Sequence, residues 1–383
     1  MNESRTQPSV VEPGSSTHAP GVIARQLGWA FFLTLAWIPV ANTSPYGDLS
    51  HWYTDHLHHS FATWVAIKKG LAIYTEQFQT IWSETGWPYP LKSWGNMPGY
   101  AYPPGIFVVF LPLVLIGKPG ILSPRAFGVC AVLWMLALAA FAFHSVIKAL
   151  QALPPGSRFA TGILAWLILS QMGLQGFFDS SYIACGGYMV AAIRRDKHER
   201  ALQWFSAASL LHFRSAVLIP LAAYAFQQAI RGKRRPEAWP WRTIVLLSSS
   251  SLICVVTFFL MYPATAAFRA EAVRVLSNPN AQAVVIVISL VTAAILLKAR
   301  EYLAAATLAI VVGLAELEVQ NFWWHGAMVL FVPLSIGIRP ASTNQVATWL
   351  RGVALFWCLA IHPIVWRDPP GQVFMEFVKF FKT

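Results

Sequence analysis

A succession of long apolar runs, separated by short basic loops, is the feature that most limits how this chain can fold. Of the 383 residues, 56% are hydrophobic and only 11% are charged, and the mean hydropathy is +0.52. Ordinary soluble domains carry about 25% charged residues, so this composition excludes that class. The sequence therefore predicts an all-α protein that crosses a membrane repeatedly.

The positions of the basic residues indicate how the helices are oriented. The formal net charge is +12, and much of it lies in short loops such as RRDKHER (194–200) and RGKRRPEAWPWR (231–242). Cytoplasmic loops of membrane proteins are enriched in Lys and Arg in this way. We therefore expect these loops to be cytoplasmic, and we expect no nucleic-acid partner.

The apolar runs predict about eleven crossings in one membrane-embedded domain, residues 22–383, after a disordered cytoplasmic tail at 1–21. The run at 105–116 is too short to cross, and a crossing there would place both basic loops outside, so we expect a re-entrant helix. The expected spans are 22–40, 125–148, 159–176, 182–193, 201–211, 216–229, 243–260, 283–297, 303–314, 326–338 and 346–365.

The longest stretch that cannot lie in lipid is the first outer loop, residues 43–104, where we expect interfacial helices near 61–71 and 80–82. Steps of three and four residues place a set of acids and histidines on one helix face. These residues are Asp48, His51, Asp55, His58 and His59. Such a stripe can hold a divalent metal, supply a general base or face water. For the histidines a solvated helix is slightly favoured over metal ligation, whereas Asp48 is favoured as a functional residue at the membrane surface.

The predicted topology gathers further polar groups at the outer surface, where charges next to lipid need partners. They are Asp48, Asp55, Asp179, Arg214, Glu316, Glu318 and His325. Asp179 and Arg214 either pair with each other or with headgroups, or bind a substrate. His325 follows two tryptophans and is either an interfacial residue or part of the site. The four cysteines lie inside apolar runs, without the spacing of a zinc site or a disulfide framework.

The order of these features resembles that of the GT-C glycosyltransferases. It is most similar to the bacterial members that use a polyprenyl-phosphate sugar, with mannosyltransferase-like loops. The features are an acid after the first span, an outer loop ending in YPPG (102–105), an outer acid, a basic cytoplasmic loop and an outer cation. The resemblance covers about residues 22–235 and, more loosely, the FWWHG segment at 322–326.

The resemblance implies a glycosyltransferase of the bacterial inner membrane, acting at the periplasmic face in glycolipid or cell-envelope glycan synthesis. The donor would be a polyprenyl-phosphate sugar, and the acceptor a hydroxyl of a lipid, glycan or protein. Asp48 would be the general base, and the substrate would contact Asp55, Tyr102, Asp179, Arg214 and His325, the last two at the phosphate. Leu49 follows Asp48, so the DxD or DE pair of the family is missing. The resemblance implies no required cofactor. Binding of a divalent metal by Asp48, His51 and Asp55 is an open alternative.

Two other classes compete with this interpretation. Outer acids and bases also line transport paths, which makes a transporter or flippase for a lipid-linked substrate the alternative. Against it, the sequence contains no evident inverted repeat and no charge in the middle of a span. A non-catalytic membrane scaffold would leave the stripe of acids and histidines unexplained.

Overall fold

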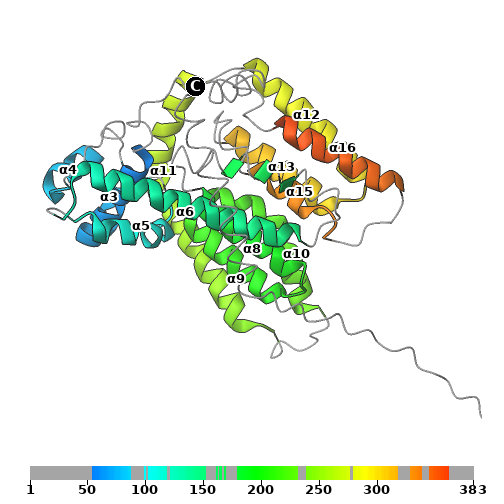
Figure 1. The fold of residues 1–383 in the computed structure, drawn as a ribbon, viewed down its shortest axis with the longest axis horizontal. Helices are drawn as coiled ribbons and strands as arrows, with labels where there is room; N and C mark the ends of the chain where they lie inside the picture. The colour runs from blue at the N-terminus through cyan, green and yellow to red at the C-terminus, as the bar shows by residue number, and fades with distance from the viewer. Residues whose placement is uncertain are drawn as a thin grey trace, which may run out of the picture.

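The computed structural model of the protein is built from helices (Figure 1). The residues it describes are 54–87, 99–100, 102–118, 121–151, 161–162, 164–165, 168–169, 179–231, 239–276, 279–317, 328–338 and 345–361. Within these ranges every regular element is a helix and none is a strand, so the predicted all-α class is confirmed.

The first half of the described chain holds α3 (Thr54–Lys69), η1 (Gly70–Tyr74), α4 (Phe78–Thr85), α5 (Gly105–Ile116), α6 (Pro124–Leu150), α8 (Ser180–Ile193) and α9 (His198–Leu211). The second half holds η2 (Phe213–Leu218), α10 (Ile219–Ile230), α11 (Trp241–Leu276), α12 (Pro279–Lys298), α13 (Tyr302–Leu317), α15 (Phe331–Ser335) and α16 (Gln345–Ile361). Most of these helices begin and end within a few residues of the predicted runs.

One boundary differs clearly from the prediction. The run expected to end at 260 continues as α11 to Leu276, through a segment that we expected to be an outer loop. That segment, FRAEAVRVL, is polar but rich in Ala, Arg, Glu and Leu, which have high helix propensity. The polarity of this segment marks the end of the apolar run, whereas its helix propensity allows α11 to continue through it.

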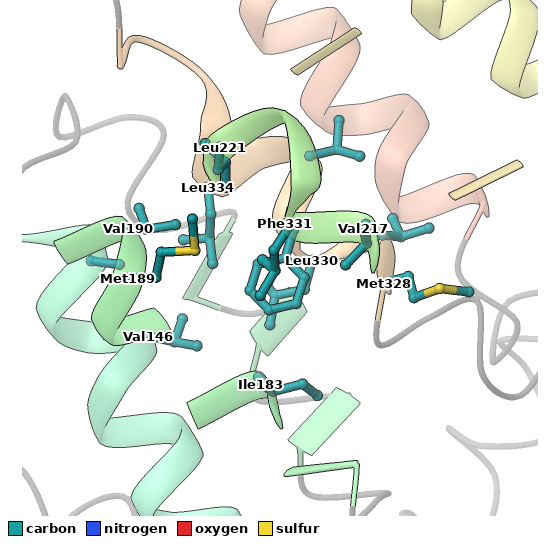
Figure 2. Packing of buried hydrophobic residues seen from close by; sticks show 14 of the residues in the cluster. Val146, Ile183, Met189, Val190, Val217, Leu221, Met328, Leu330, Phe331 and Leu334 are labelled. Atoms are coloured by element: carbon teal, nitrogen blue, oxygen red, sulfur yellow. The ribbon is translucent and has the colours of Figure 1, made fainter. Parts of the chain in front are cut away.

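Helix α8 is the central element of the larger core. Every residue of α8 except Tyr188 is buried, and the helix packs against α6, α9, η2 and α15. Two glycines allow this approach, because a Cβ atom on Gly187 would lie 2.3 Å from Ser145 Oγ of α6 and one on Gly186 would lie 2.4 Å from the Phe331 ring. Figure 2 shows Phe331 between Met189 and Val190 of α8 on one side and Val217 of η2 on the other.

A second core joins α3 and η1 to α5 and α6. Phe61 of α3, Phe110 of α5 and Phe127 of α6 are fully buried in it, and Trp87 nearly so. Figure 1 shows α3, α4 and α5 together at one end of the molecule, α12, α13 and α16 at the other, and α8, α9 and α10 between them. Residues 54–87, within the predicted first outer loop, thus form helices that pack in this second core.

Two described helices are long and apolar enough to cross a membrane, namely Leu133–Leu150 within α6 and Trp241–Met261 within α11. The second is largely exposed, with Val245, Leu252 and Phe259 at 61%, 65% and 72%. The helix α5 has the predicted bounds and 12 residues, so its length of about 18 Å falls short of a hydrocarbon core of about 30 Å. The larger count of about eleven crossings stays a prediction.

Candidate functional site

A buried ion pair lies where α8 begins. Asp179 is the N-cap residue of α8 and Arg214 lies in η2, and Arg214 Nη1 donates to Asp179 Oδ1 over 2.7 Å. Each residue is only 2% exposed. Removing two charges from water costs several kcal/mol per ion, which mutual attraction offsets only with close, well-formed contacts. The sequence left open whether Asp179 and Arg214 pair with each other. In the structure they do.

His212 connects the two partners of this ion pair. Its Nδ1 accepts a hydrogen bond from the backbone N–H of Arg214 over 3.0 Å, and its Nε2 lies 3.5 Å from Asp179 Oδ1. Complete burial, then the charge of Arg214 and then His59, hold the pKa of His212 well below its ordinary value of 6.5. The imidazole is therefore neutral at pH 7, and with Nδ1 as acceptor its proton is on Nε2, facing the carboxylate.

Aromatic rings and a second histidine surround His212. The rings of Tyr182 and Tyr102 have centroids 5.3 Å and 5.6 Å from that of His212. His59 of α3 lies 5.0 Å from the Tyr102 ring, and its Nδ1 is hydrogen-bonded to the Tyr100 hydroxyl over 2.7 Å. We call the seven residues the α8 N-terminal cluster: His59, Tyr100, Tyr102, Asp179, Tyr182, His212 and Arg214.

Backbone contacts fix the two tyrosines before α5. The Tyr100 N–H donates to Ile73 O over 2.9 Å, and the Tyr74 hydroxyl donates to Tyr102 O over 3.1 Å. Gly99 permits this approach, because a Cβ atom there would lie 2.4 Å from Tyr74 O. The YPPG turn is therefore attached to η1, which places the ring of Tyr102 beside His212, between α9 and η2.

A different polar group lies where α8 ends. Arg194 Nη2 donates to Leu334 O over 3.0 Å and to Ile336 O over 2.7 Å. Glu301, at the start of α13, accepts from the Gly337 N–H over 2.9 Å and from Arg351 Nε over 2.6 Å. Asp179 and Arg194 are separated by the length of α8, about 22 Å at 1.5 Å per residue. The predicted outer acid and the predicted cytoplasmic arginine thus lie at opposite ends of one buried helix.

Three of the predicted site residues lie together in the structure. The side chains of the others lie outside the part of the chain that the structure describes. Asp179, Arg214 and the half-buried Tyr102 belong to the α8 N-terminal cluster. Asp48, His51 and His325 lie outside the described residues, as does the side chain of Asp55, whose backbone is in α3. The described residues contain no group of three or more metal-binding side chains, and the metal predicted at Asp48, His51 and Asp55 falls outside them.

One prediction for the first outer loop is wrong. His58 and His59 are each 1% exposed, so a solvated stripe does not describe them. Helix α3 packs on α5, and the His59 ring lies 5.1 Å from the ring of Phe110 in α5. Burial also lowers the pKa of His58 from 6.5 to about 3.

Sequence reasoning missed His212 and Tyr182. His212 stands two residues before Arg214 in the turn LHFRS, and Tyr182 three residues after Asp179. For His212, the available signal was its position two residues before Arg214, which was predicted at the outer surface. Nothing in its spacing distinguishes Tyr182 from an ordinary core aromatic residue.

No protein-family model, no curated protein and no solved structure matches this chain. Its function must therefore be inferred from its own residues and from the arrangement that they form.

Proposed function

We propose that this protein is a GT-C-type glycosyltransferase of the bacterial inner membrane, which transfers a sugar from a polyprenyl-phosphate donor to a hydroxyl acceptor at the periplasmic face. The observation that carries the proposal is the buried group of Asp179, His212 and Arg214 at one end of the central helix. Charged side chains in apolar surroundings are costly, and in membrane proteins they mark functional sites by default. The family resemblance gives substrate-binding roles to Asp179, at the N-cap of α8, and to Arg214, just after α9.

The exposed surface of α11 supports the membrane location. An exposed apolar face of this length is unfavourable in water and matches the thickness of a bilayer. We propose about eleven crossings, with the short helix α5 re-entrant. The basic end of α8, at Arg194 and Arg195, is then cytoplasmic, and the end at Asp179 is periplasmic.

In the proposed reaction Asp48 takes the proton from the acceptor hydroxyl, whose oxygen attacks the anomeric carbon of the donor sugar. The bond between that carbon and the phosphate oxygen breaks, and the phosphate leaves with the bonding electrons on its polyprenyl carrier. Arg214 and His325 stabilise the growing negative charge of the phosphate, while Asp55, Tyr102 and Asp179 hold the substrates. No step of the proposed reaction requires a metal ion. Binding of a divalent metal near Asp48 is an open alternative.

The test is transfer of labelled sugar by the purified full-length protein in liposomes. The donors are undecaprenyl-phosphate mannose and undecaprenyl-phosphate glucose. The acceptor is a lipid extract from the cell envelope of the bacterium that makes the protein. Label should reach a new product without any nucleotide sugar, and an Asp48→Asn variant should lack the product. Movement of intact donor between leaflets, without cleavage of its sugar–phosphate bond, would instead support the flippase alternative.

A further inference from the structure

The residue at the start of α8 does not cap the helix. Asp is among the preferred N-cap residues because its carboxylate accepts hydrogen bonds from the first-turn N–H groups. Asp179 makes no such side-chain bond, since its carboxylate is engaged by Arg214. The first intrahelical bond runs from the Ile183 N–H to Asp179 O over 3.1 Å. The N–H groups of Ser180 and Ser181 precede it and therefore have no acceptor within α8.

Two serine hydroxyls at the same helix end supply a second, independent observation. Ser180 and Ser181 are 0% and 5% exposed, and neither hydroxyl has a hydrogen-bond partner among the described residues. Buried polar groups are nearly always hydrogen-bonded, so two adjacent exceptions need an explanation. The Cα–Cβ bonds of a helix tilt toward its N-terminus, so these hydroxyls lean toward the end where the uncapped N–H groups point.

The electrostatics of this helix end favour an anion. The aligned peptide dipoles are equivalent to about half a positive charge at the N-terminus, and phosphate groups bind at such ends through backbone N–H groups. The negative charge of Asp179 is compensated by Arg214 over 2.7 Å. Its carboxylate therefore does not leave the helix end with a net negative charge that would repel a phosphate.

We propose that the first turn of α8 is a phosphate-binding site, formed by the hydroxyls and the N–H groups of Ser180 and Ser181. The binding of a phosphate group here rests on the helix end together with the two buried hydroxyls. That the group belongs to the polyprenyl donor rests on the proposed function. Asp179 then has a positioning role, because its engagement with Arg214 and His212 keeps it from capping the turn that the phosphate occupies.

The test compares the wild type with the double variant Ser180→Ala/Ser181→Ala, using purified full-length protein in detergent. The probes are undecaprenyl phosphate and inorganic phosphate, with binding followed by phosphorus NMR. Each lost hydrogen bond to a charged group should weaken binding about ten- to a hundredfold. The hydroxyls have no partner in the described part of the protein, so alanine should leave no group newly unsatisfied and should keep the melting temperature.

Ser289→Ala is the matched control. Ser289 is also buried, at 3% exposure, and also has a hydroxyl without a partner among the described residues, but it lies well inside α12. Its replacement should leave phosphate binding unchanged. If the Ser289 variant loses binding as the double variant does, the effect is not local to α8 and the proposed site is wrong.

The remaining outcomes separate this site from the proposed function. A wild type that binds neither probe, or a double variant that binds both as tightly as the wild type does, overturns the site even if sugar transfer occurs. Binding that the double variant loses, in a protein that transfers no sugar, supports the site and overturns the function. Loss of binding for both probes identifies a phosphate group alone as the ligand, and loss for undecaprenyl phosphate only identifies the lipid headgroup.

Discussion

At the scale of single residues, the proposed chemistry depends most on Asp48. We propose that it lies just beyond the first predicted span, at the depth of the sugar–phosphate bond of a membrane-anchored donor. General-base catalysis contributes about a hundred- to ten-thousandfold, so Asp48→Asn should lower the transfer rate by at least about a hundredfold. Expression and donor binding should change little, because the amide keeps the shape of the carboxylate. Steady-state rates at saturating donor measure the effect.

Asp55 provides the control for this experiment, since it falls on the same predicted helix face one heptad later. Asp55→Asn should cost less than Asp48→Asn if it only orients the acceptor or a metal. A dead Asp55 variant beside an active Asp48 variant would move the base to Asp55. Two active variants would remove the chemical support for the glycosyltransferase proposal.

Buried histidines make the stability of the protein depend on pH. The pKa of His58 is about 3 in the folded protein and 6.5 when the ring is exposed, so below pH 6.5 the unfolded chain binds a proton that the folded chain excludes. His58 therefore contributes stability above pH 6.5 that is lost as the pH falls toward 3. The free energy of unfolding should fall by about 1.4 kcal/mol per pH unit in this window from His58 alone.

The measurement is unfolding by added denaturing detergent at several pH values, for the wild type and His58→Gln. Other titrating groups contribute to both proteins, so the difference between the two slopes isolates His58. The variant should have the shallower slope between pH 6.5 and pH 5. Equal slopes would mean that His58 is not a buried neutral imidazole.

At the scale of elements, α8 packs closely against α6 because of its glycines. In Gly187→Ala the new methyl group would lie 2.9 Å from the backbone carbon of Ser145 and 2.3 Å from Ser145 Oγ, which is itself hydrogen-bonded to Ala142 O over 2.7 Å. Since the backbone of α6 must shift, the variant should lose about 1–3 kcal/mol of stability. Thermal unfolding in detergent measures the loss.

Gly313→Ala is the matched control, because Gly313 is also in a helix but a Cβ atom there meets nothing within 4 Å. Alanine is the better helix former, so this variant should gain about 0.5–1 kcal/mol. Destabilisation of similar size in both variants would show that the loss at Gly187 is not specific to the contact with α6.

The sequence predicts these elements well where local signals decide them. Helix α6 begins with Ser123 as N-cap, whose hydroxyl accepts from the Ala126 N–H over 3.3 Å, and with Pro124 in its first turn, and its apolar run predicted the helix to within two residues at each end. The burial of His59 was not predictable, because it depends on Phe110 of α5, about fifty residues later in the chain. From the sequence alone, charged or polar residues on a short helix are predicted to face solvent, because the element that covers them is not known.

At the scale of the whole molecule, the sequence predicted that Asp179 and Arg214 share a side and left open whether they touch. Basic loops and span lengths placed Asp179 and Arg214 on the same side of the membrane, and the structure joins them across 35 residues of chain. The role of His212 depends on the turn between α9 and η2, where its ring is the N-cap of a short helix. Such a contact is set by tertiary packing, and no periodicity in the sequence reports it.

The two ends of α8 give the strongest test of the whole arrangement. Arg194 is fixed to the carbonyl groups at the end of α15, and Asp179 to η2, so the ends cannot exchange sides without breaking both sets of contacts. Ring contacts through His59 and Tyr102 attach α3 to the Asp179 end. In the proposed topology, an exposed residue of the first outer loop and an exposed residue after α8 are therefore reached from opposite faces of the membrane.

We predict that Ser83→Cys, in the exposed part of α4, reacts in intact cells with a maleimide that does not cross the inner membrane. Arg195→Cys, in the exposed turn after α8, should react only after the cells are broken. The native Cys130, Cys185, Cys254 and Cys358 are replaced by Ala in the background, so that each label reports one position. Labelling of Arg195→Cys from outside would reverse the orientation, and the α8 N-terminal cluster would then face the cytoplasm. A reversed cluster would meet nucleotide sugars before any polyprenyl-phosphate donor at the periplasmic face, and the proposed donor class would be wrong.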